Sequence, residues 1–260
     1  MDAGRLTRDL QARLDERANR KTKAWWEAYL KHVIPFRGTK MAGIRSALHE
    51  WYREEEIAGR SSPDEQKSLA LALFREEYAE DKIAGILFLQ EILLPAGVID
   101  WESDLPRFAE LFQGGWIYDW NVCDWFCVKV LGPLAETEGE ACARAISEWR
   151  RSENLWQRRA SGVAFVNLAG RGDKNFAGFT ELLLEICAVT VQHQERFSQT
   201  GTGWVLRELS VAEPEKVERF VAERVCDFSS EGLRSALEKM PDPSRDRLKG
   251  LRAQCGETKR

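Results

Sequence analysis

The sequence lacks a long apolar run, a Cys-x-x-Cys pair and an excess of positive charge. Its longest apolar stretch, 83–89, stops at Gln90, far short of the roughly 18–20 residues that cross a bilayer. No apolar segment of a secretory signal follows the N-terminus, and the six cysteines are scattered, which predicts reduced thiols and argues against a zinc site. We therefore expect an intracellular protein, cytoplasmic in a bacterium or nuclear in a eukaryote. A net charge of −4 means that any DNA binding has to come from a local basic face.

Alternating apolar and polar residues, the mark of β-strands, are almost missing as well. Apolar residues recur at helical spacing instead, and most Gly and Pro residues fall between the helical stretches. The pattern predicts three N-terminal helices followed by five helical hairpins. The predicted ranges are 2–19, 22–34 and 41–58, then the pairs 64–79 with 81–94, 104–113 with 117–131, 138–151 with 154–169, 176–192 with 195–212, and 214–226 with 229–239.

The second helices of these hairpins start at regular intervals of roughly 34–41 residues, the short end of the HEAT period. We therefore predict an all-α fold, an α-solenoid of HEAT-like hairpins over 1–240 as a single domain, with 1–60 as an N-terminal cap. The second helices of such a solenoid line a concave binding surface. The polar segment 241–260 is expected to be a flexible tail.

Ten tryptophans exceed the tyrosines and histidines together, and core packing accounts for most of them. Trp120 differs because Asp124 follows it by four residues, so both share one helical face, with Trp116 one turn earlier. A carboxylate among indole rings is costly unless it is paired or used. Two interpretations stay open: a functional carboxylate, or an ion pair with Arg159.

The next two second helices carry further candidates. Arg159 follows Trp156 by three residues, so both can project to one side of their helix. Trp204 lies in the stretch Gly-Trp-Val-Leu-Arg-Glu. Gly201 and Gly203 within this helix cost about 1 kcal/mol each relative to alanine, which predicts close approach of a neighbouring group.

At these residues the sequence resembles the DNA alkylation repair glycosylases of the AlkD-like, HEAT-repeat type. That family has a Trp followed four residues later by an Asp, an Arg three residues after a Trp two helices on, and a Trp in a Gly-Trp-Val-Leu-Arg-Glu stretch. The segments 120–124, 156–159 and 203–208 match these motifs in order, and a looser resemblance extends over about 25–240. Where the family usually has a proline after Phe-Arg-Gly, this chain has Thr-Lys-Met-Ala-Gly at 39–43.

The resemblance implies a DNA-alkylpurine N-glycosylase, a hydrolase that needs no cofactor or metal and acts as a monomer. It implies release of cationic N3- and N7-alkylated purines, such as 3-methyladenine and 7-methylguanine, from double-stranded DNA without a deep base-flipping pocket. In this scheme Asp124 stabilises the cationic sugar and holds the attacking water. Trp120 and Trp204 flank the sugar, and Arg159 binds a neighbouring phosphate.

Further basic residues are candidates for contacts with the DNA backbone, although each could equally belong to a solvated charged face. These residues are Lys40, Lys82, Arg158 and Arg196. A second function also stays open: a non-catalytic HEAT scaffold that binds DNA or a protein. Asp124 discriminates between the two functions, because a scaffold has no need of a carboxylate between tryptophans.

Overall fold

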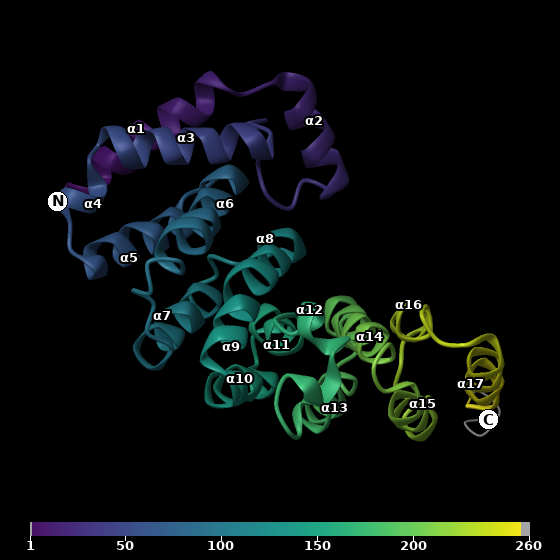
Figure 1. The fold of residues 1–260 in the computed structure, drawn as a ribbon. Helices are drawn as coiled ribbons and strands as arrows, with labels where there is room; N and C mark the ends of the chain where they lie inside the picture. Colours follow the sequence, from purple (N-terminus) through teal and green to yellow (C-terminus); the bar gives the residue numbers. More distant parts are fainter. Residues whose placement is uncertain (1, 256–260) are drawn as a thin grey trace. The chain divides into compact units, whose positions relative to one another are not determined.

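A computed structural model describes residues 2–255, and none of these residues forms a β-strand. Internal contacts divide the chain into two compact units, Met1–Val130 and Leu131–Arg260, each built from helices (Figure 1). The predicted all-α fold is confirmed. A single domain over 1–240 with a cap over 1–60 stays a prediction. Within 2–255, no helix combines the length and the apolar character needed to cross a membrane.

The first unit follows the predicted hairpins closely, with two of its helices extended by π-helical turns. Its elements are α1 (Ala3–Glu16), α2 (Arg20–Tyr29), α3 (Met41–Glu54), α4 (Ile57–Arg60), α5 (Pro63–Ala72) with the 3₁₀ turn η1 (Leu73–Arg75), α6 (Ala79–Phe88) with the π turn η2 (Leu89–Leu93), α7 (Trp101–Gln113), and α8 (Trp120–Phe126) with the π turn η3 (Cys127–Leu131).

Side chains that accept hydrogen bonds from the first backbone N–H groups explain where several helices begin. Ser62 and Glu65 form a reciprocal capping box at the start of α5, and Pro63 occupies its first turn. The residues that cap other helices of this unit in the same way are Asp2, Asn19, Asp100 and Asp119. These local signals are why the sequence predicts the helix starts well.

The second unit contains the remaining hairpins. Its elements are α9 (Gly132–Glu138), α10 (Glu140–Ser147) with η4 (Glu148–Arg151), α11 (Leu155–Val163), α12 (Val166–Ala169), η5 (Gly172–Lys174), α13 (Phe179–Thr190), α14 (Arg196–Leu209), α15 (Pro214–Glu223), α16 (Ser230–Ala236) and α17 (Asp242–Gln254). The sequence places a helix break at Gly132-Pro133, but both residues lie at the start of α9. Proline is tolerated there because the first-turn N–H groups have no partner within the helix.

Helix α17 occupies most of the segment that the sequence assigns to a flexible tail, while residues 256–260 lie outside the described part of the chain. Cys255, just after α17, forms a disulfide with Cys226, and their Cα atoms lie 5.6 Å apart. The prediction of reduced thiols is therefore wrong for this pair. Their separation of 29 residues matches no motif, and only the packing of α17 against α15 brings them together. The other four cysteines are buried and not disulfide-bonded.

Close packing between α14 and α16 depends on a glycine. A Cβ atom at Gly203 would lie 2.4 Å from the carbonyl oxygen of Gly232 and 2.9 Å from Cβ of Ser235. The predicted close approach to Gly203 is thus confirmed, and the neighbour is backbone, which cannot move aside as a flexible side chain can.

Gly203→Ala should therefore destabilise the protein by about 1–2 kcal/mol, because overpacking costs roughly 1–3 kcal/mol and exceeds the gain in helix propensity. Urea unfolding followed by circular dichroism measures this difference. Gly250→Ala, on α17, is the matched control, since a Cβ there meets nothing within 4 Å. Equal stabilities of the two variants would contradict the packing role of Gly203.

Candidate functional site

Helix α8 presents the candidate carboxylate. The Asp119 side chain caps α8, because its Oδ1 accepts hydrogen bonds from the backbone N–H groups of Asn121 at 2.8 Å and Val122 at 3.1 Å. The cap sets Trp120 at the first position, so Asp124 lies one turn later on the same face. Both side chains are half-buried. The π turn η3 follows directly, and such turns are frequent at functional sites.

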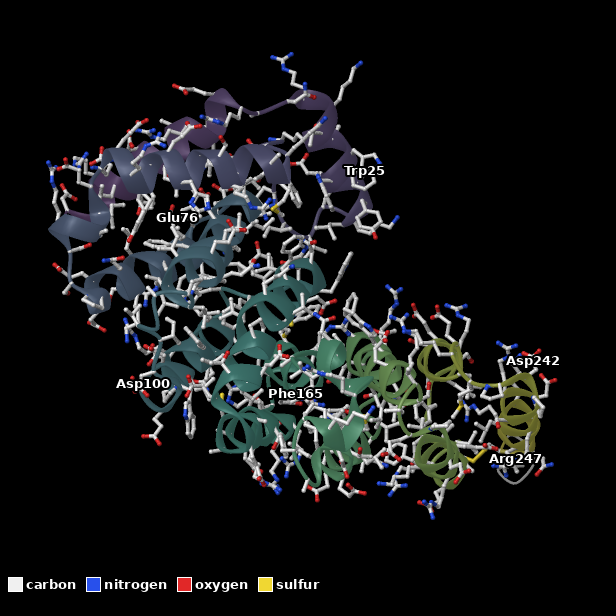
Figure 2. All side chains as sticks on the ribbon, in the orientation of Figure 1. Trp25, Glu76, Asp100, Phe165, Asp242 and Arg247 are labelled. Atoms are coloured by element: carbon white, nitrogen blue, oxygen red, sulfur yellow. A yellow bond between two sulfur atoms is a disulfide. The ribbon has the colours of Figure 1, made fainter. Side chains whose placement is uncertain are left out.

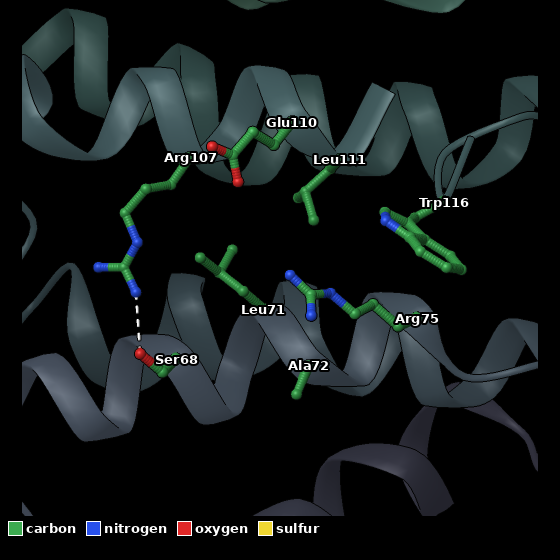
Figure 3. Close-up of a pocket in the computed structure, with 8 residues that line it drawn as sticks. All are labelled: Ser68, Leu71, Ala72, Arg75, Arg107, Glu110, Leu111 and Trp116. Atoms are coloured by element: carbon green, nitrogen blue, oxygen red, sulfur yellow. Dashed lines mark hydrogen bonds between the residues drawn. The ribbon is translucent and has the colours of Figure 1, made fainter. Parts of the chain in front are cut away.

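Trp116 does not share this face, contrary to the prediction, because it precedes α8 in the loop after α7. It lines a cavity of about 290 Å³ between α5 and α7, together with residues such as Arg75 and Leu111 (Figure 3). Its side chain is 36% exposed. This cavity contains none of the predicted site residues.

A buried polar cluster lies beneath the start of α8. Burial raises the pKa of Asp119 to about 6, and its Oδ2 is buried without a hydrogen-bond partner. Lys82 is only 2% exposed, and its Nζ donates to the carbonyl oxygen of Phe74 at 2.5 Å and lies 5.5 Å from the Tyr118 ring. Burial lowers the pKa of Lys82. Since a DNA phosphate cannot reach an ammonium group inside the protein, we withdraw Lys82 as a DNA contact.

Aromatic side chains of α2 reach Trp120. The Tyr29 ring meets the Trp120 ring edge to face, with centroids 5.8 Å apart, and Trp25 stacks on Tyr29 at 5.1 Å. Sequence reasoning missed Tyr29. The available signal was its spacing of four residues from Trp25, which places both on one helical face.

The loop before α3, which departs from the family pattern, is held by charged residues at the start of α6. The Glu80 carboxylate accepts hydrogen bonds from the backbone N–H groups of 37–39 at 2.8–3.0 Å. Arg37 pairs with Asp81 at 3.0 Å. Burial raises the pKa of Asp81 to about 6, while the charge of Arg37 opposes the rise. Lys40, at the end of this loop, is exposed and stays a candidate DNA contact.

In the second unit, α14 holds Arg159 of α11, a residue that is 7% exposed. The Nη1 atom of Arg159 donates to the Phe197 carbonyl oxygen at 2.7 Å and to Thr200 Oγ1 at 3.3 Å. A Cβ at Gly201 would lie 3.0 Å from the same nitrogen, so the glycine leaves room for the guanidinium. The predicted close approach at Gly201 is confirmed. Trp204 lies on the same helix, half-buried, with the Arg207 guanidinium 5.9 Å from its ring.

The two other basic candidates of this unit have different surroundings. Arg158 is 1% exposed, and its guanidinium donates to the Ser152 carbonyl oxygen at 2.7 Å and to Glu195 at 2.8 Å. Its role inside the protein is structural, so we withdraw it as a DNA contact. Arg196 is exposed and makes a bidentate ion pair with Glu231 at 2.7 Å, and it stays a candidate.

Comparison with known proteins identifies the family. Residues 10–240 match the model of the DNA alkylation repair enzyme family. The chain belongs to this family. Among solved structures, a predicted DNA alkylation repair enzyme from Enterococcus faecalis is similar, with a TM-score of 0.72 and 18% identity over 87% of this chain and 98% of that chain. This likeness confirms the predicted HEAT-like α-solenoid fold class. Comparison of the DNA alkylation repair family member with curated proteins finds no match.

Proposed function

We propose that this DNA alkylation repair family member is a DNA-alkylpurine N-glycosylase. It hydrolyses the N-glycosidic bond of cationic N3- and N7-alkylated purines in duplex DNA. The observation that carries the proposal is the half-buried carboxylate of Asp124, one turn after Trp120 on α8, in a chain of this repair family.

The chemistry suits a single carboxylate. An alkylated purine already carries a positive charge, so it leaves with the bonding electron pair as a neutral base, and positive charge develops on the deoxyribose. Asp124 stabilises that cation and accepts a proton from the water that attacks C1′. Two unit charges about 4 Å apart at an effective dielectric of about 20 interact by roughly 4 kcal/mol. This corresponds to about a thousandfold in rate.

The remaining residues bind rather than react. Trp120 and Trp204 offer their π faces to the cationic sugar and exclude water around it. The guanidinium of Arg159 binds a phosphate beside the lesion, for which its planar fork of donors is suited. Arg159 is 7% exposed, so it is less deeply buried than Lys82 at 2% or Arg158 at 1%. Lys40 and Arg196, both exposed, add contacts with the DNA backbone.

Incubation with methylated duplex DNA, followed by identification of the released bases, tests the proposal. We expect free 7-methylguanine and 3-methyladenine together with abasic sites in the DNA. Tight DNA binding without any released base would favour the alternative, a non-catalytic HEAT scaffold.

Arg159→Ala should weaken binding to all duplexes alike, because one phosphate contact is lost. The slope of log Kd against log salt concentration should fall by about one. Fluorescence anisotropy at several salt concentrations measures the slope. Arg158→Ala is the matched control, since the buried Arg158 should affect the melting temperature and leave the slope unchanged. If Arg159→Ala behaved like this control, the structural ion-pair interpretation would replace the phosphate contact.

A further inference from the structure

Helix α2 carries two aromatic rings, those of Trp25 and Tyr29, that are more than half exposed. None of its ten residues is buried, although it carries two tryptophans and a tyrosine. Trp26 packs inward against Phe36, with ring centroids 5.7 Å apart and planes 12° apart. Trp25 and Tyr29 are 58% and 51% exposed and stack on each other with planes 9° apart. Figure 2 shows Trp25 projecting outward from α2.

Exposed basic residues lie on either side of this stacked pair along the chain. Arg20 and Lys21 are exposed in the first turn of α2, and Lys31 is exposed just after its end. Cations at a helix N-terminus oppose the helix dipole, so helix stability does not explain Arg20 and Lys21. The carboxylate of α2, on Glu27, is half-buried, accepts a hydrogen bond from the backbone N–H of Phe36 at 3.2 Å and pairs with Lys23 at 3.7 Å. It therefore does little to offset the exposed cations.

We infer that Trp25 and Tyr29 form a platform on which an unpaired nucleobase of the bound DNA stacks. Every base has a π face that stacks on an aromatic ring, and cations beside the ring attract the phosphates on either side. An acidic protein segment would match the charge but carries a planar ring only where an aromatic residue occurs, whereas every nucleotide carries one. The three basic residues named above bind the backbone of the same strand.

The platform adjoins the proposed site at Trp120. In placing the platform beside a bound lesion, the inference rests on the proposed function. The Tyr29 ring contacts the Trp120 ring on one side and the Trp25 ring on the other. A lesion held against Trp120 thus has a second stacking surface within reach of a neighbouring nucleotide. The DNA that fits best is a duplex with a displaced base close to the lesion.

Binding of undamaged oligonucleotides tests the platform. Two labelled duplexes, one fully paired and one with a single-nucleotide bulge, are titrated by fluorescence anisotropy. Trp25→Ala should weaken binding of the bulged duplex roughly tenfold, as expected for one lost stacking contact, and change binding of the paired duplex less than about twofold. Trp25→Phe should restore most of the affinity for the bulge. Trp116→Ala, which removes another partly exposed tryptophan of the same unit, should change neither affinity.

An unchanged affinity of Trp25→Ala for the bulged duplex would overturn the inference, and so would an equal loss on both duplexes. A loss of the same size in Trp116→Ala would also overturn it. Since these ligands carry no lesion, the result does not depend on base release. Failure of the proposed glycosylase activity and failure of the platform are therefore separate outcomes.

Discussion

Replacing Asp124 by asparagine should abolish base release from methylated duplex DNA and leave the fold and the DNA affinity almost unchanged. Asparagine keeps the size and polarity of the side chain on α8 but removes the negative charge. In the proposed mechanism that charge stabilises the cationic sugar in the transition state and contributes little to ground-state binding. Single-turnover release of 7-methylguanine measures the effect, with anisotropy and thermal melting as controls. Asp64→Asn, at an exposed carboxylate, is a matched control that should keep full activity.

More than about a tenth of wild-type activity in Asp124→Asn, a loss under about 1.4 kcal/mol, would rule out the catalytic role. The structural interpretation makes a different prediction, because an Asp124–Arg159 ion pair would contribute to stability. A double-mutant cycle of Asp124→Asn and Arg159→Ala separates the two. Additive losses of stability indicate that the two residues act independently in folding. A coupling energy of about 0.5 kcal/mol or more, as found for residues in contact, indicates an ion pair between them.

The helices could be predicted because their signals are local. The box formed by Ser62 and Glu65 starts α5 where expected, and the four-residue spacing of Trp120 and Asp124 places both on one face of α8. Such patterns depend on neighbours within one or two helical turns. Gly203 is a further local signal. Glycine lowers the stability of a helix, so its presence within α14 predicts a close contact, although the sequence does not identify Gly232 as the neighbour.

Burial of the basic residues could not be predicted from the same patterns. Lys82 follows Glu80 and Asp81, a charged run that is typical of an exposed face, yet every residue of α6 is buried. Whether such a run is solvated or enclosed depends on elements distant in the sequence, here the loop of Arg37 and the cap of α8. The disulfide of Cys226 is a further case, since its partner Cys255 directly follows α17, in the segment that the sequence assigns to a tail.

Lesion choice should follow the charge of the leaving base, with 7-methylguanine and 3-methyladenine released and hypoxanthine and uracil retained. A neutral base needs a proton as it leaves, and general acid catalysis typically contributes about a hundredfold or more. The sequence has three histidines, His32, His49 and His193, and none lies within two helical turns of Asp124 along the chain. Within the first unit, His49 bonds to Glu91 at 2.8 Å, and His32 is exposed beyond the end of α2. Asp119 has a raised pKa, but it is buried as the cap of α8.

Single-turnover release from four duplexes that differ only in the lesion tests whether lesion choice follows the charge of the leaving base or recognition of that base by the protein. Without a general acid, the two neutral lesions should react at least about a hundredfold more slowly than 7-methylguanine. The same duplexes incubated without protein serve as the baseline, because they measure the spontaneous release of each base. Lowering the pH should not rescue hypoxanthine, since the proposed mechanism uses no general acid. Comparable rates on hypoxanthine and 7-methylguanine would instead require an acid or a base-binding pocket, and the lability of a cationic purine could no longer explain the selectivity of the enzyme.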